Sequence, residues 1–367
     1  MAEETKKRKE DHIRICLNQK AQARKVTAGF EDLRFVHNAL PEIDKEKIDL
    51  STVIFDHRFS APLIVGAITG GTPEATRINA TIAEAVEKLG LGMGVGSQRA
   101  AMEDKRLEET FAIARKKAPT AFLIANIGAV QLANGYGLKE AKKAIEMIDA
   151  DAVAIHLNPL QEAVQPEGQT NFNGIFGKIG EIAKGLEKPV IAKETGAGIA
   201  AEEAKKLAFA GVKGIDVGGA GGTSFAAVEY YRAKETQSSF QRFLGDVFWD
   251  WGIPTAASIA EVAQTVNIPI IASGGIRDGT DIAKALALNA SLTSLSQPAL
   301  RSAVKGVKEI ENMLSLLIEA LRNAMFLVGA EKVAHLAKAP IVVTGKTAEW
   351  LKTRGFDIED YARRGER

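Results

Sequence analysis

The feature that most constrains the fold is a regular alternation between residue 61 and about residue 322. Short runs of Val, Ile and Ala are followed there by longer stretches with helical periodicity. We expect eight strands, at residues 62–68, 91–95, 121–127, 152–157, 190–193, 215–217, 270–273 and 291–295. The helical patterns between them can connect parallel strands, for example 73–89, 105–117, 139–148, 200–210, 256–266 and 280–288. Eight such units predict an α/β fold of the (β/α)8 or TIM barrel type rather than a doubly wound sheet.

Other parts of the chain do not belong to this repeat. We expect residues 1–60 to form an N-terminal arm and extension, residues 61–322 the barrel, and residues 323–367 a C-terminal helical tail packed on the barrel. A long insertion, residues 220–252, follows the sixth strand and carries several aromatic residues. Loops of this length in compact domains are usually lids or binding loops, so we expect the insertion to serve a site.

Composition excludes several classes of protein. Lys and Arg number 47 against 46 Asp and Glu, and a formal net charge of +1 argues against a nucleic-acid or membrane-surface binder. The single cysteine, Cys16, cannot form an internal disulfide, and no apolar stretch approaches the roughly 20 residues of a membrane span. The first residues are charged rather than apolar, unlike a signal peptide. These features predict a cytoplasmic protein.

The carboxyl ends of the predicted strands are where a barrel of this type carries its site. Nearly every position there is polar or glycine, including Thr69, Asn126, His156 and Lys193. Burying such groups unpaired costs several kcal/mol, so a ligand-filled mouth explains them best. For any single residue, a hydrogen-bond network without a ligand remains the alternative.

Two glycine-rich turns after the later strands suit a cofactor phosphate. They are Gly221-Gly222-Thr223-Ser224 and Gly274-Gly275-Ile276-Arg277, and glycine lets backbone N–H groups approach an anion closely. Tight turns without an anion are the alternative. Lys193 can face a flavin ring and stabilise negative charge on it, or it can form a salt bridge with an Asp or Glu.

A set of short motifs occurs in order along the chain: Arg8-Lys9-x-x-His12, Thr69-Gly70-Gly71, Gly96-Ser97-Gln98-Arg99, His156-Leu157-Asn158-x-x-Gln161-Glu162, Lys193-Glu194-x-Gly196-x-Gly198, Gly221-Gly222-Thr223, Trp251-Gly252-Ile253-Pro254-Thr255 and Gly274-Gly275-Ile276-Arg277. Together they resemble type II isopentenyl diphosphate isomerase, the flavin-dependent isomerase, in its archaeal form. The resemblance covers residues 6 to about 300 and extends to the helix after them.

The resemblance implies interconversion of isopentenyl diphosphate and dimethylallyl diphosphate in isoprenoid biosynthesis, with reduced FMN and Mg²⁺. NAD(P)H would serve only to reduce the flavin, and the enzyme would be a homo-oligomer, a tetramer or larger. The implied FMN contacts are Ala67, Ile68, Thr69, Ser97, Asn126, Lys193, Thr223, Gly275, Ile276, Arg277, Ser296 and Gln297. The implied substrate contacts are Arg8, Lys9, His12, Ser97, Arg99, His156, Asn158 and Gln161. Glu162 would ligate Mg²⁺, and Gln161, Lys193 and His156 would be catalytic.

These roles agree with the chemistry of the side chains. A diphosphate is held by Mg²⁺ with one carboxylate and by cations, so the N-terminal basic run becomes a substrate-closing arm. Gln161 is no general base by its own pKa and is expected to orient the substrate or to relay a proton. The chain departs from the family at the eighth strand, where it reads Thr293-Ser294-Leu295-Ser296-Gln297 in place of a glycine-rich turn with Met and Ala before Pro298.

Two other functions compete with this interpretation. The first is an FMN-dependent TIM-barrel oxidoreductase, of the inosinate dehydrogenase or hydroxy-acid oxidase kind. The former needs a cysteine in a barrel loop, yet Cys16 precedes the barrel, and the latter needs a late histidine, yet none lies between His156 and His335. The second is a non-catalytic flavin- or phosphate-binding module, which would not require Glu162 beside Gln161 or the basic arm.

Overall fold

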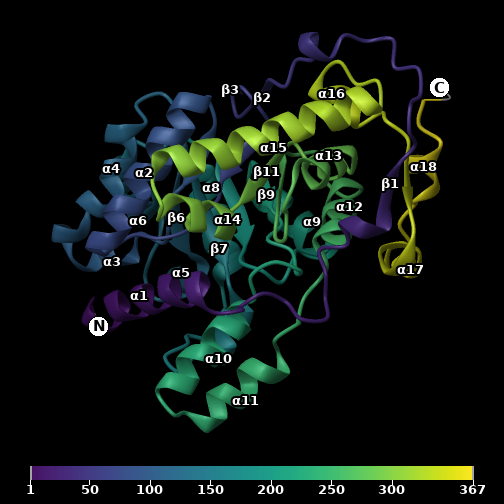
Figure 1. Ribbon diagram of the computed structural model, residues 1–367. Helices are drawn as coiled ribbons and strands as arrows, with labels where there is room; N and C mark the ends of the chain where they lie inside the picture. The colour runs from purple at the N-terminus through teal and green to yellow at the C-terminus, as the bar shows by residue number, and fades with distance from the viewer. Residues whose placement is uncertain (1, 366–367) are drawn as a thin grey trace.

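The computed structural model describes residues 2–365, and its centre is a closed barrel of eight parallel strands (Figure 1). The strands follow one another around the barrel in chain order, and the last pairs with the first. They are β4 (Leu63–Val65), β5 (Gly92–Gly94), β6 (Phe122–Gly128), β7 (Ala152–Leu157), β8 (Val190–Glu194), β9 (Gly214–Asp216), β10 (Ile270–Ser273) and β11 (Leu292–Leu295). Each predicted strand segment overlaps one of these strands, so the predicted (β/α)8 barrel is confirmed.

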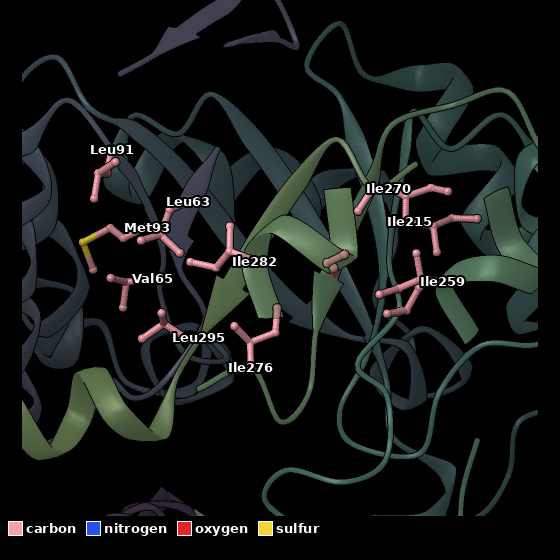
Figure 2. Packing of buried hydrophobic residues seen from close by; sticks show 14 of the residues in the cluster. Leu63, Val65, Leu91, Met93, Ile215, Ile259, Ile270, Ile276, Ile282 and Leu295 are labelled. Atoms are coloured by element: carbon pink, nitrogen blue, oxygen red, sulfur yellow. The ribbon is translucent and has the colours of Figure 1, made fainter. Parts of the chain in front are cut away.

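Helices cover the outside of the barrel and bury an apolar face against it. Those that follow the strands are α2 (Pro73–Leu89), α4 (Glu109–Lys117), α6 (Leu138–Ile148), α8 (Ile175–Gly185), α9 (Ala201–Ala210), α12 (Thr255–Ala263), α13 (Gly279–Ala287) and α14 (Gln297–Ala303). Figure 2 shows part of this layer, in which Met93 and Leu295 from strands lie in one cluster with Ile259 and Ile282 from helices. Each fully buried aliphatic side chain contributes roughly 1.5–3 kcal/mol.

Local sequence signals set the ends of these helices. The Thr72 hydroxyl accepts a hydrogen bond from Ala75 N at 3.1 Å at the start of α2, and Pro73 needs no partner for its nitrogen there. The helix ends at Gly90, whose φ of 63° favours glycine. Asp278 caps α13 in the same way by accepting from Thr280 N at 2.8 Å.

The amino-terminal end of the barrel is closed by a hairpin of β2 (Thr52–Ile54) and β3 (His57–Phe59). Phe55 and Phe59 place their rings 5.9 Å and 5.4 Å from the ring of Phe122, the first residue of β6. Inward-facing aliphatic residues of other strands complete this cluster. The base of the barrel is therefore an apolar plug.

The N-terminal helix α1 (Ala2–Asn18) lies at the opposite end of the barrel, where it contacts α10 (Phe225–Glu235) and α14 (Figure 1). The insertion after β9 is not an irregular loop, because it folds into α10 and α11 (Ser239–Val247). Ile15 of α1 packs with Val228 and Trp249, which fixes the insertion to the arm. Short helices on other loops of this end are α3 (Arg99–Glu103), α5 (Ala129–Ala133) and α7 (Pro159–Val164).

The rest of the N-terminal region joins the C-terminal region away from the mouth. β1 (Leu33–Phe35) pairs antiparallel with β12 (Ile341–Val343). The remaining elements are η1 (Phe30–Asp32), η2 (Lys45–Lys47), η3 (Lys105–Leu107), α15 (Val307–Leu327), α16 (Val333–Leu336), α17 (Gly345–Thr353) and α18 (Glu359–Ala362). Of the described part of residues 1–60, only α1 lines the cavity described below. Within residues 2–365, no helix has both the length and the apolar character needed to cross a membrane.

Candidate active site

The barrel opens at the carboxyl ends of its strands into a cavity of about 270 Å³. Every strand end contributes to the wall, and α1 and the first residue of α10 contribute from outside the barrel. All residues that the family resemblance implies for the site line this one cavity: Arg8, Lys9, His12, Ala67, Ile68, Thr69, Ser97, Arg99, Asn126, His156, Asn158, Gln161, Glu162, Lys193, Thr223, Gly275, Ile276, Arg277, Ser296 and Gln297.

α1 presents a cationic face to the cavity. Arg8, Lys9 and His12 lie on this face because they are adjacent or one turn apart along the helix. Lys9 Nζ donates to Ser97 O at 2.7 Å, which ties the arm to the loop after β5. Burial, together with the charge of Arg8, lowers the pKa of Lys9 to about 7. A bound anion would restore its positive form, so this lysine suits a phosphate ligand.

A buried carboxylate on α10, Glu229, holds the arm from the other side. Its Oε1 lies 2.9 Å from His12 Nε2, and its Oε2 accepts from Arg232 at 2.5 Å. Burial acts to raise the pKa of Glu229, but the hydrogen bond from His12 and the charge of Arg232 hold that pKa below its usual range. Arg232 also binds Glu167, which lies 3.9 Å from Arg8. An ionic network thus positions two substrate-binding candidates at once.

His156 extends from the end of β7 toward the cavity. Its Nδ1 lies 2.8 Å from Asn126 Oδ1, and Asn126 Nδ2 donates to Val95 O at 3.1 Å. This orientation of the amide makes Oδ1 an acceptor, so the histidine Nδ1 donates and Nε2 keeps a free lone pair. Desolvation, followed by the charges of Lys193 and Lys9, lowers the pKa of His156 to about 4. The ring is therefore neutral near pH 7.

Lys193 shows both features that the sequence left open, because it lines the cavity and also forms an ion pair. Its Nζ lies 2.9 Å from Asp216 Oδ2, and it donates to Glu194 O at 3.2 Å. The other Asp216 oxygen accepts from the Ser273 hydroxyl. One cation is thus fixed at the floor of the cavity by residues of three neighbouring strands.

Glu162 is a buried carboxylate surrounded by amide groups. It accepts from Asn158 Nδ2 at 2.9 Å, from Gln165 Nε2 at 2.7 Å and from Gln169 N at 2.7 Å. The Oδ1 of Asn158 and the Oε1 of Gln165 are buried without a partner. Gln161 also lines the cavity, and its Oε1 accepts from Asn158 Nδ2 at 3.3 Å. A carboxylate and two amide oxygens without a partner are ligand types that a hard divalent cation binds.

The two glycine-rich turns differ in position. Gly274 and Gly275 line the cavity with φ of 101° and 79°. Gly221 and Gly222 do not line it, and a Cβ on Gly222 would lie 2.5 Å from Gly275 N. The first turn therefore contributes only Thr223 to the cavity wall among the four residues of its motif, and its glycines support the second turn.

Gln297 lines the cavity, but its side chain already binds the arm. The Nε2 atom donates to Cys16 O at 3.2 Å, and Oε1 accepts from Gln22 Nε2 at 2.8 Å. The phosphate contact expected of this side chain would compete with these bonds. Its neighbour Ser296 also lines the cavity.

Sequence reasoning missed residues of two kinds. Gln131 and Gln165 line the cavity, while Asp216 and Glu229 lie behind it and hold residues that do. Gln165 had an available signal, because its spacing of three from Glu162 places both on one helical face. Glu229 had none, since only the tertiary fold brings it to His12.

Comparisons with known proteins give one consistent picture. The family described as FMN-dependent dehydrogenase matches residues 1–144 and 160–343. The isopentenyl-diphosphate delta-isomerase of Methanosarcina barkeri is 51% identical over 366 residues, which cover 100% of both chains. Those of Methanothermobacter thermautotrophicus and Pyrococcus furiosus are 50% and 48% identical, covering 97% of this chain and 99% and 91% of theirs.

Solved structures with low sequence identity share the fold. A putative lactate oxidase of Pediococcus acidilactici superposes with a TM-score of 0.66 at 18% identity, covering 94% of both chains. A mandelate oxidase variant with a C4a-OH-FMN adduct gives 0.61 at 19% identity, covering 93% of this chain and 99% of that one.

Proposed function

The chain belongs to the FMN-dependent dehydrogenase family and, within it, to the isopentenyl-diphosphate delta-isomerases, and on this premise we propose that it interconverts isopentenyl diphosphate and dimethylallyl diphosphate. The reaction moves a proton between the ends of an allylic unit without net redox change. The observation that carries the proposal is that the cationic face of α1 and the carboxylate Glu162 line one cavity. A diphosphate needs both the cations and a metal-binding oxygen.

FMN fits the cavity. Thr69 Oγ1 is buried without a partner, Gly274 and Gly275 offer backbone to a phosphate, and Arg277 lies beside them. When bound, reduced flavin supplies a ring nitrogen that can give or take a proton, and NAD(P)H is needed only to reduce it. The residues that would hold FMN are Ala67, Ile68, Thr69, Ser97, Asn126, Lys193, Thr223, Gly275, Ile276, Arg277, Ser296 and Gln297.

Mg²⁺ fits beside Glu162. The unpartnered amide oxygens of Asn158 and Gln165 lie on side chains that bond this carboxylate. A single carboxylate agrees with Mg²⁺, which keeps water and phosphate oxygens as its other ligands. Glu162 would therefore help to hold Mg²⁺, which would supply positive charge to the diphosphate.

The chain's own residues bind and enclose the substrate. Arg8, Lys9 and Arg99 supply charge to the diphosphate, and His12, held by Glu229, lines the same side of the cavity. Residues of α1 form one side of the cavity wall, so the arm would help to shield the reacting carbons from water.

Two further side chains face the reacting part of the substrate. Neutral His156 offers Nε2 as a hydrogen-bond acceptor, while its Nδ1–H group donates to Asn126 Oδ1. Gln161 orients the alkene, because its amide has no pKa suited to a base.

An FMN-dependent oxidoreductase is the competing function, since the family and the fold include oxidases. Cys16 reaches the cavity, but burial raises the pKa of its thiol to about 12, so it is not a thiolate nucleophile near neutral pH. Among the described residues, His12 and His156 are the histidines of the cavity, and the first is held by Glu229 while the second lies on the fourth barrel strand, β7. Neither follows a late strand of the barrel, where a hydroxy-acid oxidase needs its histidine base.

The test is an anaerobic assay with FMN, Mg²⁺ and a reductant. Isopentenyl diphosphate should be converted to dimethylallyl diphosphate at equilibrium without stoichiometric use of the reductant. Inert substrate would overturn the proposal. Turnover of lactate or mandelate with oxygen would support the oxidoreductase instead.

We further propose a cytoplasmic homo-oligomer, a tetramer or larger. Cys16 is a free thiol, which suits a reducing compartment. Phe240, Phe243 and Trp251 expose more than half of their surface on or beside α11, which is unusual for a monomer. Light scattering of the wild-type chain and of Phe243→Glu tests assembly at this surface.

A further inference from the structure

We propose that Asp216 is a positioning residue for the reaction, one that fixes Lys193 at the cavity floor and sets how much positive charge the bound flavin meets. The inference rests on the proposed function, because it assigns the flavin to this cavity. Lys193 Nζ and Asp216 Oδ2 are 2.9 Å apart, and the two side chains expose only 15% and 5% of their surface.

The geometry of Asp216 is fixed from three strands. Lys193 on β8 is the register partner of Asp216 on β9, so both side chains point to the same layer of the barrel. The Ser273 hydroxyl, from β10, donates to Asp216 Oδ1 and accepts from Gly218 N at 3.1 Å. The carboxylate therefore has no freedom to follow a moving lysine, and the lysine must stay with it.

Stability alone does not explain this ion pair. Replacing a buried ion pair by well-packed apolar residues is often neutral or stabilising. The barrel interior around it is apolar, because Ile191 precedes Lys193 by two positions on β8 and Ile271 on β10 is the register partner of Asp216. A charged pair at the top of that stack is instead explained by a need for a cation in the cavity.

Asp216 has two effects on that cation. The first is to hold Lys193 Nζ in one place. Without the carboxylate, Glu194 O, which accepts from Nζ at 3.2 Å, would be the remaining partner, and the ammonium group would be less tightly fixed. The second is to compensate part of the positive charge of Lys193. That positive charge acts on other groups of the cavity, because it contributes to the lowered pKa of His156. A flavin in the cavity would meet a lysine that is ordered and partly neutralised.

The central experiment is Asp216→Asn, which keeps the shape of the side chain and removes its charge. With less negative charge at the floor, the reduced anionic flavin is favoured, so the midpoint potential of bound FMN should become more positive. We expect kcat to fall about tenfold or more as Lys193 loses its fixed position, and KM for the diphosphate to change less than about threefold. Ser273→Ala keeps the ion pair and its charges, so kcat should fall by less than in Asp216→Asn and the potential should change little.

A matched control is Asp151→Asn. Asp151 pairs with Arg115 at 2.8 Å just before β7, at the opposite end of the barrel. It should lower stability without moving the flavin potential. In Lys193→Met, the additional Asp216→Asn change should shift the potential clearly less than it does when Lys193 is present, because only the direct effect of the lost charge on the flavin remains.

The outcomes separate the inference from the proposed function. An unchanged potential in folded, FMN-loaded Asp216→Asn would overturn the inference. The same holds if the shift persists undiminished in the Lys193→Met background. If wild-type protein binds FMN and the potential shifts as expected but isopentenyl diphosphate is inert, the proposed function fails and the role of Asp216 stands.

Discussion

The two ends of the barrel follow opposite rules. At the base, Phe55, Phe59 and Phe122 pack ring against ring and the hairpin of β2 and β3 covers them. At the mouth, many buried side chains are polar, and Thr69 Oγ1 and Asn158 Oδ1 have no partner in the described structure. Burial of apolar rings at the base stabilises the fold. Burial of polar groups at the mouth lowers the stability of the fold.

This difference separates folding from chemistry along one axis of the molecule. A protein selected only for stability would not leave buried polar atoms without partners, since each costs about 1–3 kcal/mol. The unpartnered atoms of the mouth are therefore explained by ligands. Substitutions at the base should then lower stability and leave turnover unchanged, whereas substitutions at the mouth should lower turnover and leave stability nearly unchanged.

The largest effect is expected at the base, from Phe122→Ala. Loss of this ring should lower the free energy of unfolding by about 3–5 kcal/mol, because the closed hairpin cannot collapse into the space left. Chemical denaturation followed by circular dichroism measures it. The kcat of the folded fraction should equal that of the wild type, and a drop in kcat with unchanged stability would break the comparison.

At the mouth, Glu162→Gln should act on turnover instead. We expect Mg²⁺-dependent kcat to fall about a hundredfold or more, since the carboxylate is replaced by a neutral amide. FMN affinity, measured by flavin fluorescence, should change little. The free energy of unfolding should also stay close to that of the wild type.

The control for this variant is Glu181→Gln on α8, an exposed carboxylate far from the cavity wall. It should match the wild type in every measurement. Unchanged activity of Glu162→Gln would remove the metal role of this residue.

The barrel and the cavity wall could be predicted from the sequence because both depend on short-range patterns. Apolar runs of strand length predicted β4 to β11, and the rule that sites lie at the carboxyl ends of barrel strands pointed to Asn126, His156 and Lys193. The motifs of the family supplied the arm residues Arg8 and Lys9, which no periodicity would distinguish from a solvated tail.

What the sequence did not predict depends on contacts across the fold. We predict the sixth strand at 215–217, and in the structure β9 ends at Asp216. The pairing of Asp216 with Lys193 depends on the register between β8 and β9, which is a contact across the fold. Glu229 lies on a helix that was expected to be a loop. The plug at the base combines Phe55 and Phe122, which lie far apart in the sequence.

A smaller effect is expected from the pH dependence of substrate binding. The pKa of Lys9 is lowered to about 7 by burial and by Arg8, so above pH 7 the lysine in the free cavity loses its proton. A bound diphosphate raises that pKa again, so binding should take up a proton. Affinity should fall with rising pH above 7, by at most about tenfold per unit.

Calorimetry in two buffers of different ionisation enthalpy measures this proton uptake. Burial also raises the pKa of Glu194 to about 7, but this residue does not line the cavity. Lys9→Met separates the two groups, because it should abolish the uptake while Glu194 remains. Uptake that persists in Lys9→Met would exclude Lys9 as its source.

The smallest effect tests the comparison most directly. Thr69→Val removes a buried hydroxyl that has no partner, so the FMN-free protein should become slightly more stable, by up to about 1 kcal/mol. Thr72→Val is the matched control, because the Thr72 hydroxyl caps α2 and its loss should destabilise by about 1 kcal/mol. Loading with FMN should reverse the order for Thr69→Val, since the wild-type hydroxyl then gains a partner. Denaturation of both variants with and without FMN gives the four values. A destabilised FMN-free Thr69→Val would mean that the mouth, like the base, is built for stability.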